Sequence, residues 1–185
     1  MLGLVILVTG VYFEQRQKSE QRNPQISGIV YDKSIQTQYG QPIKVARVID
    51  GDTIELINGD RVRYMGMDTP EEFDKRKPVQ CFALEAANKN RELVEGKEIK
   101  FYKDVSDRDK YGRWLGYVYL ADGTFVNLAL VKDGYAFAYP YPPDISKSAD
   151  FEKAQETARM GKLGLWAGCN VSTEKSGREQ TNSVQ

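Results

Sequence analysis

Histidine is absent from this chain of 185 residues. The absence removes the commonest general base of enzymes and the commonest zinc ligand. We therefore expect any metal site to be built from oxygen atoms, which favours a hard cation such as calcium or magnesium. Net charge is absent as well, because 26 lysines and arginines balance 26 aspartates and glutamates. This balance argues against a protein that coats nucleic acid through bulk charge, but it allows a local basic groove.

The N-terminal apolar run is too short for a membrane-spanning helix. It extends from Leu2 to Phe13, about a dozen residues, whereas a spanning helix needs ~20. Such a length is typical of the core of a signal peptide. Residues 1–25 are therefore predicted to be a membrane-targeting segment, cleaved or retained as an anchor, and the protein to be secreted or extracytoplasmic. The alternative is an N-terminal strand or buried helix. Residues 26–41 are polar and are expected to be a linker.

Alternating apolar residues begin after Pro42 and predict a β-rich domain over residues 42–169, followed by a disordered polar tail at 170–185. Asn58–Asp60 reads as a hairpin turn. Strands are expected around Ile43 and Val45, Ile54 and Leu56, Val62 and Tyr64, and at 97–103 and 113–120; helices are expected at 79–95, 125–134 and 148–161. This order favours an α+β, mainly β, class: a five-stranded OB-fold barrel with about three helices packed outside.

Carboxylates gather at two of the predicted strand ends. Asp52 leaves one turn, and Asp68 ends a neighbouring strand. Two converging carboxylates repel each other unless a cation lies between them, and calcium would accept both together with carbonyl and water oxygens. Taken alone, each acidic motif is more typical of an ordinary turn.

Arginines and a further acid accompany these carboxylates. Glu71 follows Asp68 in a proline-containing turn and is suited to orient an attacking water or to accept its proton. Arg63 lies five residues before Asp68, and Arg113 follows "DKYG". Guanidinium groups beside a metal and a carboxylate suggest a phosphodiester substrate, whose transition-state charge they would neutralise. Taken singly, these arginines fit an exposed strand and a polar loop.

Three motifs occur in order: "IDGDT", "R-x₄-DTPE" and "DKYGR", with a helix between the second and the third. Together they resemble the staphylococcal-nuclease-like (thermonuclease) family over roughly residues 42–166. The resemblance implies an OB-fold barrel and calcium-dependent hydrolysis of DNA and RNA. By motif position it implies Asp52, Asp68 and the Thr69 carbonyl as calcium ligands, Arg63 and Arg113 as phosphate-contacting arginines, and Glu71 as base or water-orienting residue.

The resemblance is looser at the residues that would hold the nucleotide. It implies that Lys110 and Tyr111 contact the terminal phosphate and the nucleotide, and that Tyr139 and Tyr141 frame the base. Aromatic stacking tolerates any base, which suits a non-specific nuclease. The alternative is that these tyrosines only pack at the barrel mouth. Asn90, on the inner face of the first helix, receives no role from the sequence.

A second hypothesis is an OB-fold module that binds nucleic acid or a protein and has weak or no catalytic activity. Such modules usually lack one of the acids or arginines, and here all of these positions are filled. A third hypothesis, a surface protein that interacts with lipid or with the cell envelope, rests on the N-terminal segment alone. A monomer is expected.

The chain has two cysteines, Cys81 and Cys169. An even number in an exported protein predicts a disulfide between them. The alternative is a pair of free, buried thiols.

Overall fold

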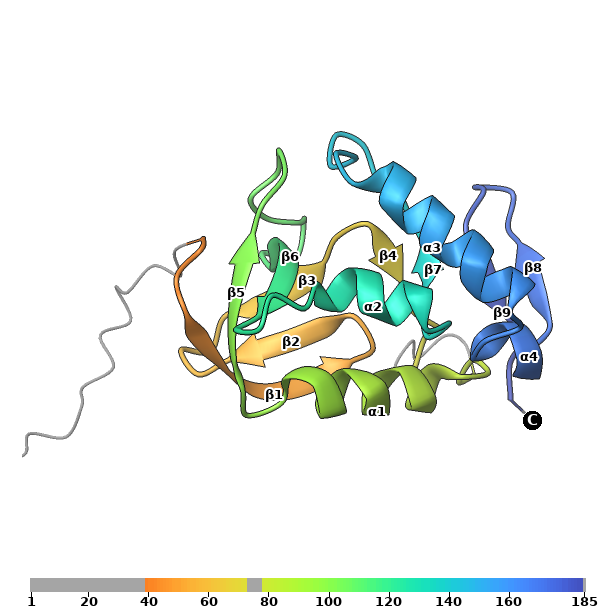
Figure 1. Ribbon diagram of the computed structural model, residues 1–185, viewed down its shortest axis with the longest axis horizontal. Coiled ribbons are helices and arrows are strands. Elements are labelled where there is room, and N and C mark those ends of the chain that lie inside the picture. Colours follow the sequence, from red (N-terminus) through yellow and green to blue (C-terminus); the bar gives the residue numbers. More distant parts are fainter. Residues whose placement is uncertain (1–38, 73–77, 185) are drawn as a thin grey trace, which may run out of the picture. The chain divides into compact units, whose positions relative to one another are not determined.

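Residues 39–72 and 78–184 are described by the computed structural model of the chain (Figure 1). The predicted targeting segment and most of the predicted linker lie outside the described residues. Within these two ranges, no helix combines the length and the apolar character that crossing a bilayer requires.

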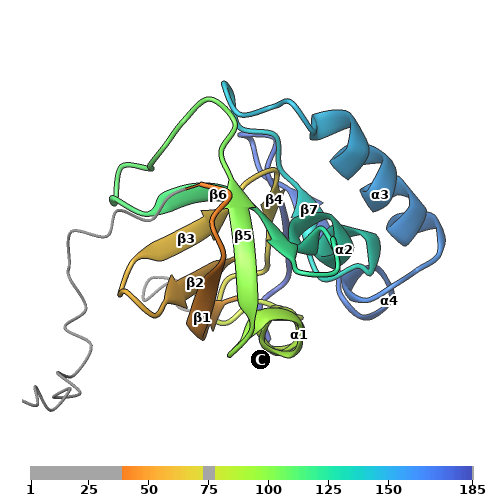
Figure 2. The same cartoon turned by 60° about the vertical axis from the view of Figure 1, so that its left-hand side comes forward.

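Five strands form a closed barrel in the order β1-β2-β3-β6-β5 (Figure 2). They are β1 (Ile43–Asp50), β2 (Thr53–Leu56), β3 (Arg61–Tyr64), β5 (Glu98–Tyr102) and β6 (Trp114–Leu120). All neighbours are antiparallel except β3 and β6, which are parallel. Alternate residues fill the interior, among them Val45, Ile54, Val62, Ile99, Phe101 and Val118. The prediction of a five-stranded OB-fold barrel is confirmed.

Three helices of more than one turn pack outside the barrel in the described ranges, as predicted: α1 (Ala83–Val94), α2 (Val126–Lys132) and α3 (Ser148–Met160). Figure 2 shows α2 between the barrel and α3. The first helix begins later than predicted because Phe82 has a φ of 71°, which no helical residue adopts. The short helix α4 (Leu165–Gly168) was not predicted.

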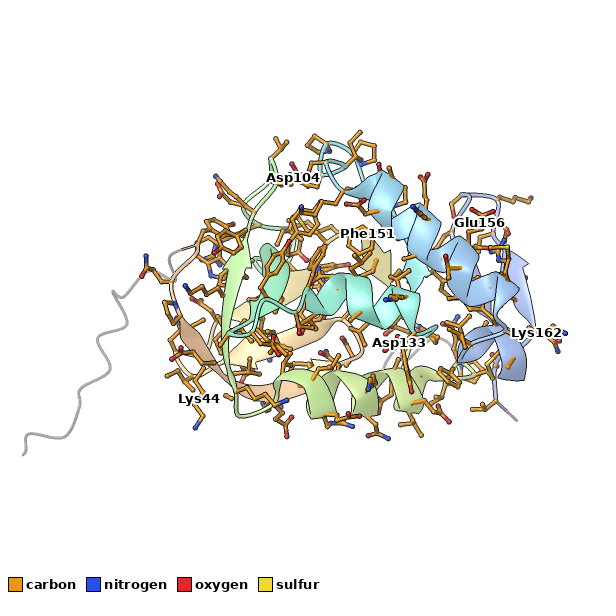
Figure 3. The ribbon with its side chains drawn as sticks, in the orientation of Figure 1. Lys44, Asp104, Asp133, Phe151, Glu156 and Lys162 are labelled. Carbon is orange, nitrogen blue, oxygen red and sulfur yellow. A yellow bond between two sulfur atoms is a disulfide. The ribbon has the colours of Figure 1, made fainter. Side chains whose placement is uncertain are left out.

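Phe151 fixes α3 against the barrel. Its side chain is 1% exposed and projects from α3 toward the barrel in Figure 3. Its ring lies 5.6 Å from that of Phe125, between centroids. A Cβ on Gly66, which has a φ of 77°, would come within 2.3 Å of the Phe151 ring. Glycine at position 66 therefore lets the chain between β3 and β4 (Met67–Asp68) pass directly under α3.

The N-terminal boundary of the domain differs from the prediction. Tyr39 and Gly40, assigned to the linker, pack on the barrel. The Tyr39 ring lies 5.2 Å from Phe101 and 5.4 Å from Trp114, between centroids, and Gly40 N donates to Phe101 O over 2.9 Å. The domain thus includes residues 39–41, because an aromatic ring covers the open edge of the core there.

The prediction of a disordered tail is wrong for residues 170–184. Strands β8 (Val171–Thr173) and β9 (Glu179–Thr181) form a hairpin beside α4 and the end of α3 (Figure 1). The hairpin is held by the segment before α1: Cys81 N donates to Asn182 O over 2.7 Å, and Thr181 Oγ1 donates to Cys81 O over 2.8 Å. These polar strands are ordered by distant contacts, which a local pattern does not reveal.

Cys81 and Cys169 form a disulfide in the structure, with their Cα atoms 5.9 Å apart and a separation of 88 residues in sequence. The bond joins the segment before α1 to the C-terminal end of α4, shortly before the hairpin. It therefore ties the start of the first helix to the end of the last helix of the described ranges.

Candidate active site

Two acidic side chains and one arginine meet at one end of the barrel. Asp52 lies in the β1–β2 turn and Asp68 ends β4, and the two residues are only 1% and 3% exposed. Arg63, in β3, donates from Nη1 to Asp52 Oδ1 and from Nη2 to Asp68 Oδ1, the latter over 2.6 Å. One guanidinium therefore bridges the two carboxylates that the sequence predicts as metal ligands.

Burial dominates the electrostatics of these groups. It raises the pKa of Asp52 to about 6, although Arg63 acts in the opposite direction. Burial likewise raises the pKa of Asp68. For Arg63, burial alone would lower the pKa, but Asp52 and Asp68 outweigh it and hold the pKa above its ordinary value. Two buried carboxylates side by side thus depend on nearby positive charge to remain ionised.

Thr69 and the β1–β2 turn are in close contact. Thr69 N lies 3.3 Å from Asp52 Oδ2, to which it donates. A Cβ on Gly51 would lie 2.6 Å from Thr69 Oγ1, so only glycine allows this approach. The turn that carries Asp52 therefore lies directly against the residue that follows Asp68.

Asn90 anchors the same turn from α1. Its Nδ2 donates to Asp50 O over 3.1 Å, and its Oδ1 accepts a hydrogen bond from the Tyr64 hydroxyl over 2.9 Å. Asn90 is fully buried. Its role is therefore to hold the β1–β2 turn in place, which the sequence alone did not reveal.

Arg113 reaches the site from the loop before β6. Asp109 orients it: Arg113 Nε donates to Asp109 Oδ2 over 2.7 Å. Its Nη1 lies 3.3 Å from Thr53 Oγ1, which in turn donates to Asp52 Oδ1 over 3.2 Å. Thr53 thus connects the second predicted arginine to the first predicted metal ligand. Thr53 is the last residue of the "IDGDT" motif. Its hydroxyl group, next to Asp52 in the sequence, could have marked it as a residue of the candidate site.

Glu71 follows Asp68 and is held through its backbone by Gln80. Gln80 Oε1 accepts from Glu71 N over 2.6 Å, and Gln80 N donates to Glu71 O over 3.0 Å. Gln80 is 8% exposed. It was not predicted as a site residue, and no local motif marks it.

The four residues predicted to hold the nucleotide form two groups. Tyr139 and Tyr141 follow β7 (Phe137–Ala138), with ring centroids 6.3 Å apart. Tyr139 N donates to Gly66 O over 2.9 Å, which ties this pair to the chain before Asp68. Lys110 and Tyr111 lie in the Arg113 loop, with Lys110 Nζ 5.1 Å from the Tyr111 ring centroid. Tyr111 and Tyr141 are 71% and 67% exposed, so neither is a packing residue of the core.

The donor set suits a hard cation. Asp52 and Asp68 converge closely enough to share one positive group, Arg63. No cluster of three or more acidic, cysteine or histidine side chains that could hold a metal occurs in the described ranges. A calcium ion here would thus depend on two carboxylates, with carbonyl, water or substrate oxygens completing its usual set of about six to eight ligands.

Comparison with known proteins gives the family. The family model described as "Staphylococcal nuclease homologue" matches residues 61–168. The chain belongs to this family. The thermonuclease of Staphylococcus intermedius is 39% identical over 140 residues, which cover 74% of this chain and 82% of the relative. The thermonuclease of Staphylococcus hyicus is 32% identical over 169 residues, 89% of this chain and 96% of the relative. The family predicted from the motifs is confirmed.

Two longer relatives also match the chain. Endonuclease YncB of Bacillus subtilis is 39% identical over 138 residues, 72% of this chain and 65% of the relative. The SPbeta prophage-derived endonuclease YokF of the same species is 36% identical over 152 residues, and the chain spans about half of its length (51%).

One site contact of this family member comes from outside the family match. Arg178, in the β8–β9 hairpin, donates from Nε to Asp68 Oδ2 over 2.6 Å. Burial acts to lower the pKa of Arg178, but Asp68 raises it above the ordinary value. Sequence reasoning missed this residue because it assigned residues 170–185 to a disordered tail.

Proposed function

We propose that this protein is a calcium-dependent, sugar-non-specific nuclease that hydrolyses phosphodiester bonds of DNA and RNA. Its family and its thermonuclease and endonuclease relatives make it a nuclease-type hydrolase. The observation that carries the finer proposal is the single guanidinium of Arg63 between the buried carboxylates of Asp52 and Asp68. This contact supports the proposal because two carboxylates suited to a cation lie beside a guanidinium suited to a phosphate.

In this proposal Asp52, Asp68 and the Thr69 carbonyl hold calcium, which would supply positive charge to a phosphate oxygen and to a bound water. Glu71 accepts a proton from the attacking water or orients it toward phosphorus. Gln80 holds the backbone of Glu71 in place in the loop, through its side-chain oxygen and its backbone N–H. Histidine is not needed in any of these roles.

Arg63 and Arg113 stabilise the negative charge that develops on the phosphate oxygens. Arg63 approaches from the barrel strand β3, and Arg113 approaches from the loop, oriented by Asp109. Both guanidinium groups are largely covered, with side-chain exposures of 22% and 26%. Covered donors are worth more to a developing charge than donors in open water.

The exposed aromatic and basic residues hold the polymer. Tyr139 and Tyr141 offer ring faces to a base, and Lys110 with Tyr111 contacts a neighbouring phosphate and nucleotide. These contacts distinguish neither bases nor sugars, which supports a non-specific substrate range.

Plasmid degradation tests the activity and the metal together. We expect cleavage of plasmid DNA and of RNA with calcium, loss of cleavage with EDTA, and little activity with magnesium, whose octahedral geometry is stricter. Full activity in EDTA would contradict the metal assignment, and equal activity in magnesium would contradict the choice of ion. Tight binding without cleavage would point to a non-catalytic OB-fold module instead.

Substitutions test the residue roles. Arg63→Ala, Arg113→Ala and Glu71→Gln should each lower kcat by about 10²–10³-fold while circular dichroism remains unchanged. Arg61→Ala is the matched control on the same strand: its side chain is 53% exposed and pairs with Glu55. An essential Arg61 with a dispensable Arg63 would contradict the assignment.

We also propose that residues 1–25 direct export of the protein and are then either cleaved or retained as a membrane anchor. The disulfide supports this proposal, because such bonds persist in oxidising compartments. A reporter enzyme fused behind residues 1–25 should be found outside the cytoplasm. A chain lacking residues 1–38 should fold as a monomer and remain active, since the packed region begins at Tyr39. A reporter retained in the cytoplasm would contradict the proposed export.

A further inference from the structure

The β8–β9 hairpin brings a third arginine to the active site. Arg178 donates from both Nε and Nη2 to Asp68 Oδ2, each over 2.6 Å. Its guanidinium also lies 6.0 Å from the ring centroid of Tyr139, the first residue of the predicted base-binding pair. Arg178 therefore stands between the carboxylate of the metal site and the aromatic residues, on the opposite oxygen of Asp68 from Arg63.

The hairpin that carries Arg178 is held on several sides. The disulfide of Cys81 fixes its start, and Gln80 Nε2 donates to Gln180 Oε1 over 3.3 Å. On the other side, Glu179 accepts from Gln155 Nε2 of α3 over 2.8 Å and also pairs with Arg159. Because these contacts do not involve the side chain of Arg178, the backbone at position 178 is fixed independently of the contact with Asp68.

Arg178 has N–H donors that its contact with Asp68 does not use. A guanidinium carries five N–H groups, and the contact with Asp68 uses the Nε and Nη2 atoms. The side chain remains 34% exposed, so a ligand can reach it. Guanidinium groups bind phosphate in bidentate geometry. Because Arg178 lies 6.0 Å from the Tyr139 ring centroid, it is within reach of the backbone of a nucleotide whose base contacts that ring.

We propose that Arg178 is a substrate-binding residue that contacts the nucleic-acid backbone at a phosphate next to the scissile one, on the Tyr139 side. The assignment rests on the proposed nuclease function and extends it. Arg63 and Arg113 act on the reacting phosphate, whereas Arg178 holds the chain beside it. Removing Arg178 should therefore weaken substrate binding and leave the chemical step nearly unchanged.

Binding without turnover tests the assignment directly. A fluorescein-labelled single-stranded DNA of about ten nucleotides is titrated with the Glu71→Gln protein in calcium, and anisotropy is recorded at several salt concentrations. Arg178→Ala in this background should weaken binding about tenfold and reduce the slope of log affinity against log salt by about one. Arg178→Lys should lose less affinity than Arg178→Ala, because it keeps the positive charge. It should still bind more weakly than the parent, because lysine cannot contact a phosphate in bidentate geometry.

Arg159→Ala is the matched control, because it removes an ion pair of the same hairpin with Glu179 but no charge from the site. It should leave affinity and salt slope unchanged. In protein with Glu71 intact, Arg178→Ala should raise KM about tenfold and change kcat less than about twofold. A calcium titration of the same variants adds an independent readout.

Each alternative role has a distinct result. If Arg178→Ala binds the oligonucleotide as tightly as its parent with the same salt slope, the assignment is overturned. If the variant only binds calcium more tightly, Arg178 is a competitor for Asp68 and the assignment is also overturned. Equal losses in Arg178→Ala and Arg159→Ala would indicate a structural role of the hairpin and overturn it as well. A parent protein that neither binds nor cleaves nucleic acid would overturn the proposed function itself.

Discussion

Replacing Asp52 by asparagine should stabilise the metal-free protein at neutral pH while it abolishes nuclease activity. Burial raises the pKa of Asp52 to about 6, from an ordinary value of 3.8. A difference of this size corresponds to about 3 kcal/mol of folding free energy at pH 7. Asparagine has nearly the same shape, and its amide oxygen can still accept from Arg63 or from Thr69 N. It carries no charge that burial would penalise.

The pH dependence follows from the direction of the pKa change. The folded state holds the Asp52 proton more tightly than the unfolded state, so the contribution of Asp52 to wild-type stability falls as the pH rises from about 4 to about 6. The asparagine of the variant does not titrate. The stability difference between variant and wild type should therefore be near zero at pH 4 and reach about 1–3 kcal/mol at pH 7.

Urea denaturation in EDTA at about pH 4 and pH 7 measures this difference. Asp122→Asn is the control, because Asp122 is exposed and the Thr124 N–H lowers its pKa. That substitution should not stabilise the protein at neutral pH. Adding calcium should reduce the advantage of Asp52→Asn, because a bound cation stabilises only the folded wild type. A variant less stable than the wild type at neutral pH in EDTA would refute the reasoning, since the ion pair with Arg63 would then outweigh the cost of burial.

Three further variants test the supports of the site. Replacing Cys81 and Cys169 by serine should lower the free energy of unfolding by about 2–5 kcal/mol, measured in guanidinium chloride, with nuclease activity retained; two titratable thiols in the oxidised, denatured wild type would contradict the bond. Asn90→Ala should cost about 2–4 kcal/mol in a urea titration, because it leaves the buried Tyr64 hydroxyl without this partner and removes a hydrogen bond to the turn carbonyl of Asp50; an unchanged midpoint would contradict its role. Gly51→Ala should lower activity at least about tenfold, because its Cβ would meet Thr69 at 2.6 Å; a fully active variant would show that the turn can shift without cost.

The barrel and the meeting of Arg63 with Asp68 were predictable from the sequence for a physical reason. Alternation such as that of Ile54 and Leu56 reports directly which face of a strand is buried. The spacing of five residues between Arg63 and Asp68 keeps the two groups in one strand-to-turn segment, where local geometry brings them together. Motifs of this kind are visible because their members are close in the chain.

The contact of the C-terminal hairpin with Asp68 was not predictable in this way. The contact between Arg178 and Asp68 joins residues 110 positions apart, and no periodicity reports such a pair. The strands of the hairpin that carries Arg178 are three residues long and polar, so their composition is that of a loop. Tyr39 was missed for the same reason, since its place on Phe101 and Trp114 depends on strands that come much later.

The position of the hairpin in the chain has a consequence for synthesis. A chain translated only as far as Trp166 already contains the whole barrel and every residue assigned to the metal and to the reacting phosphate. It lacks Cys169, and with it the covalent tie to Cys81, as well as Arg178. If Arg178 holds the substrate, the growing polypeptide binds nucleic acid weakly until the hairpin that carries Arg178 has been made and has docked. The bond to Cys81 can form only after Cys169 has been made, so the covalent tie of the hairpin also comes after the barrel.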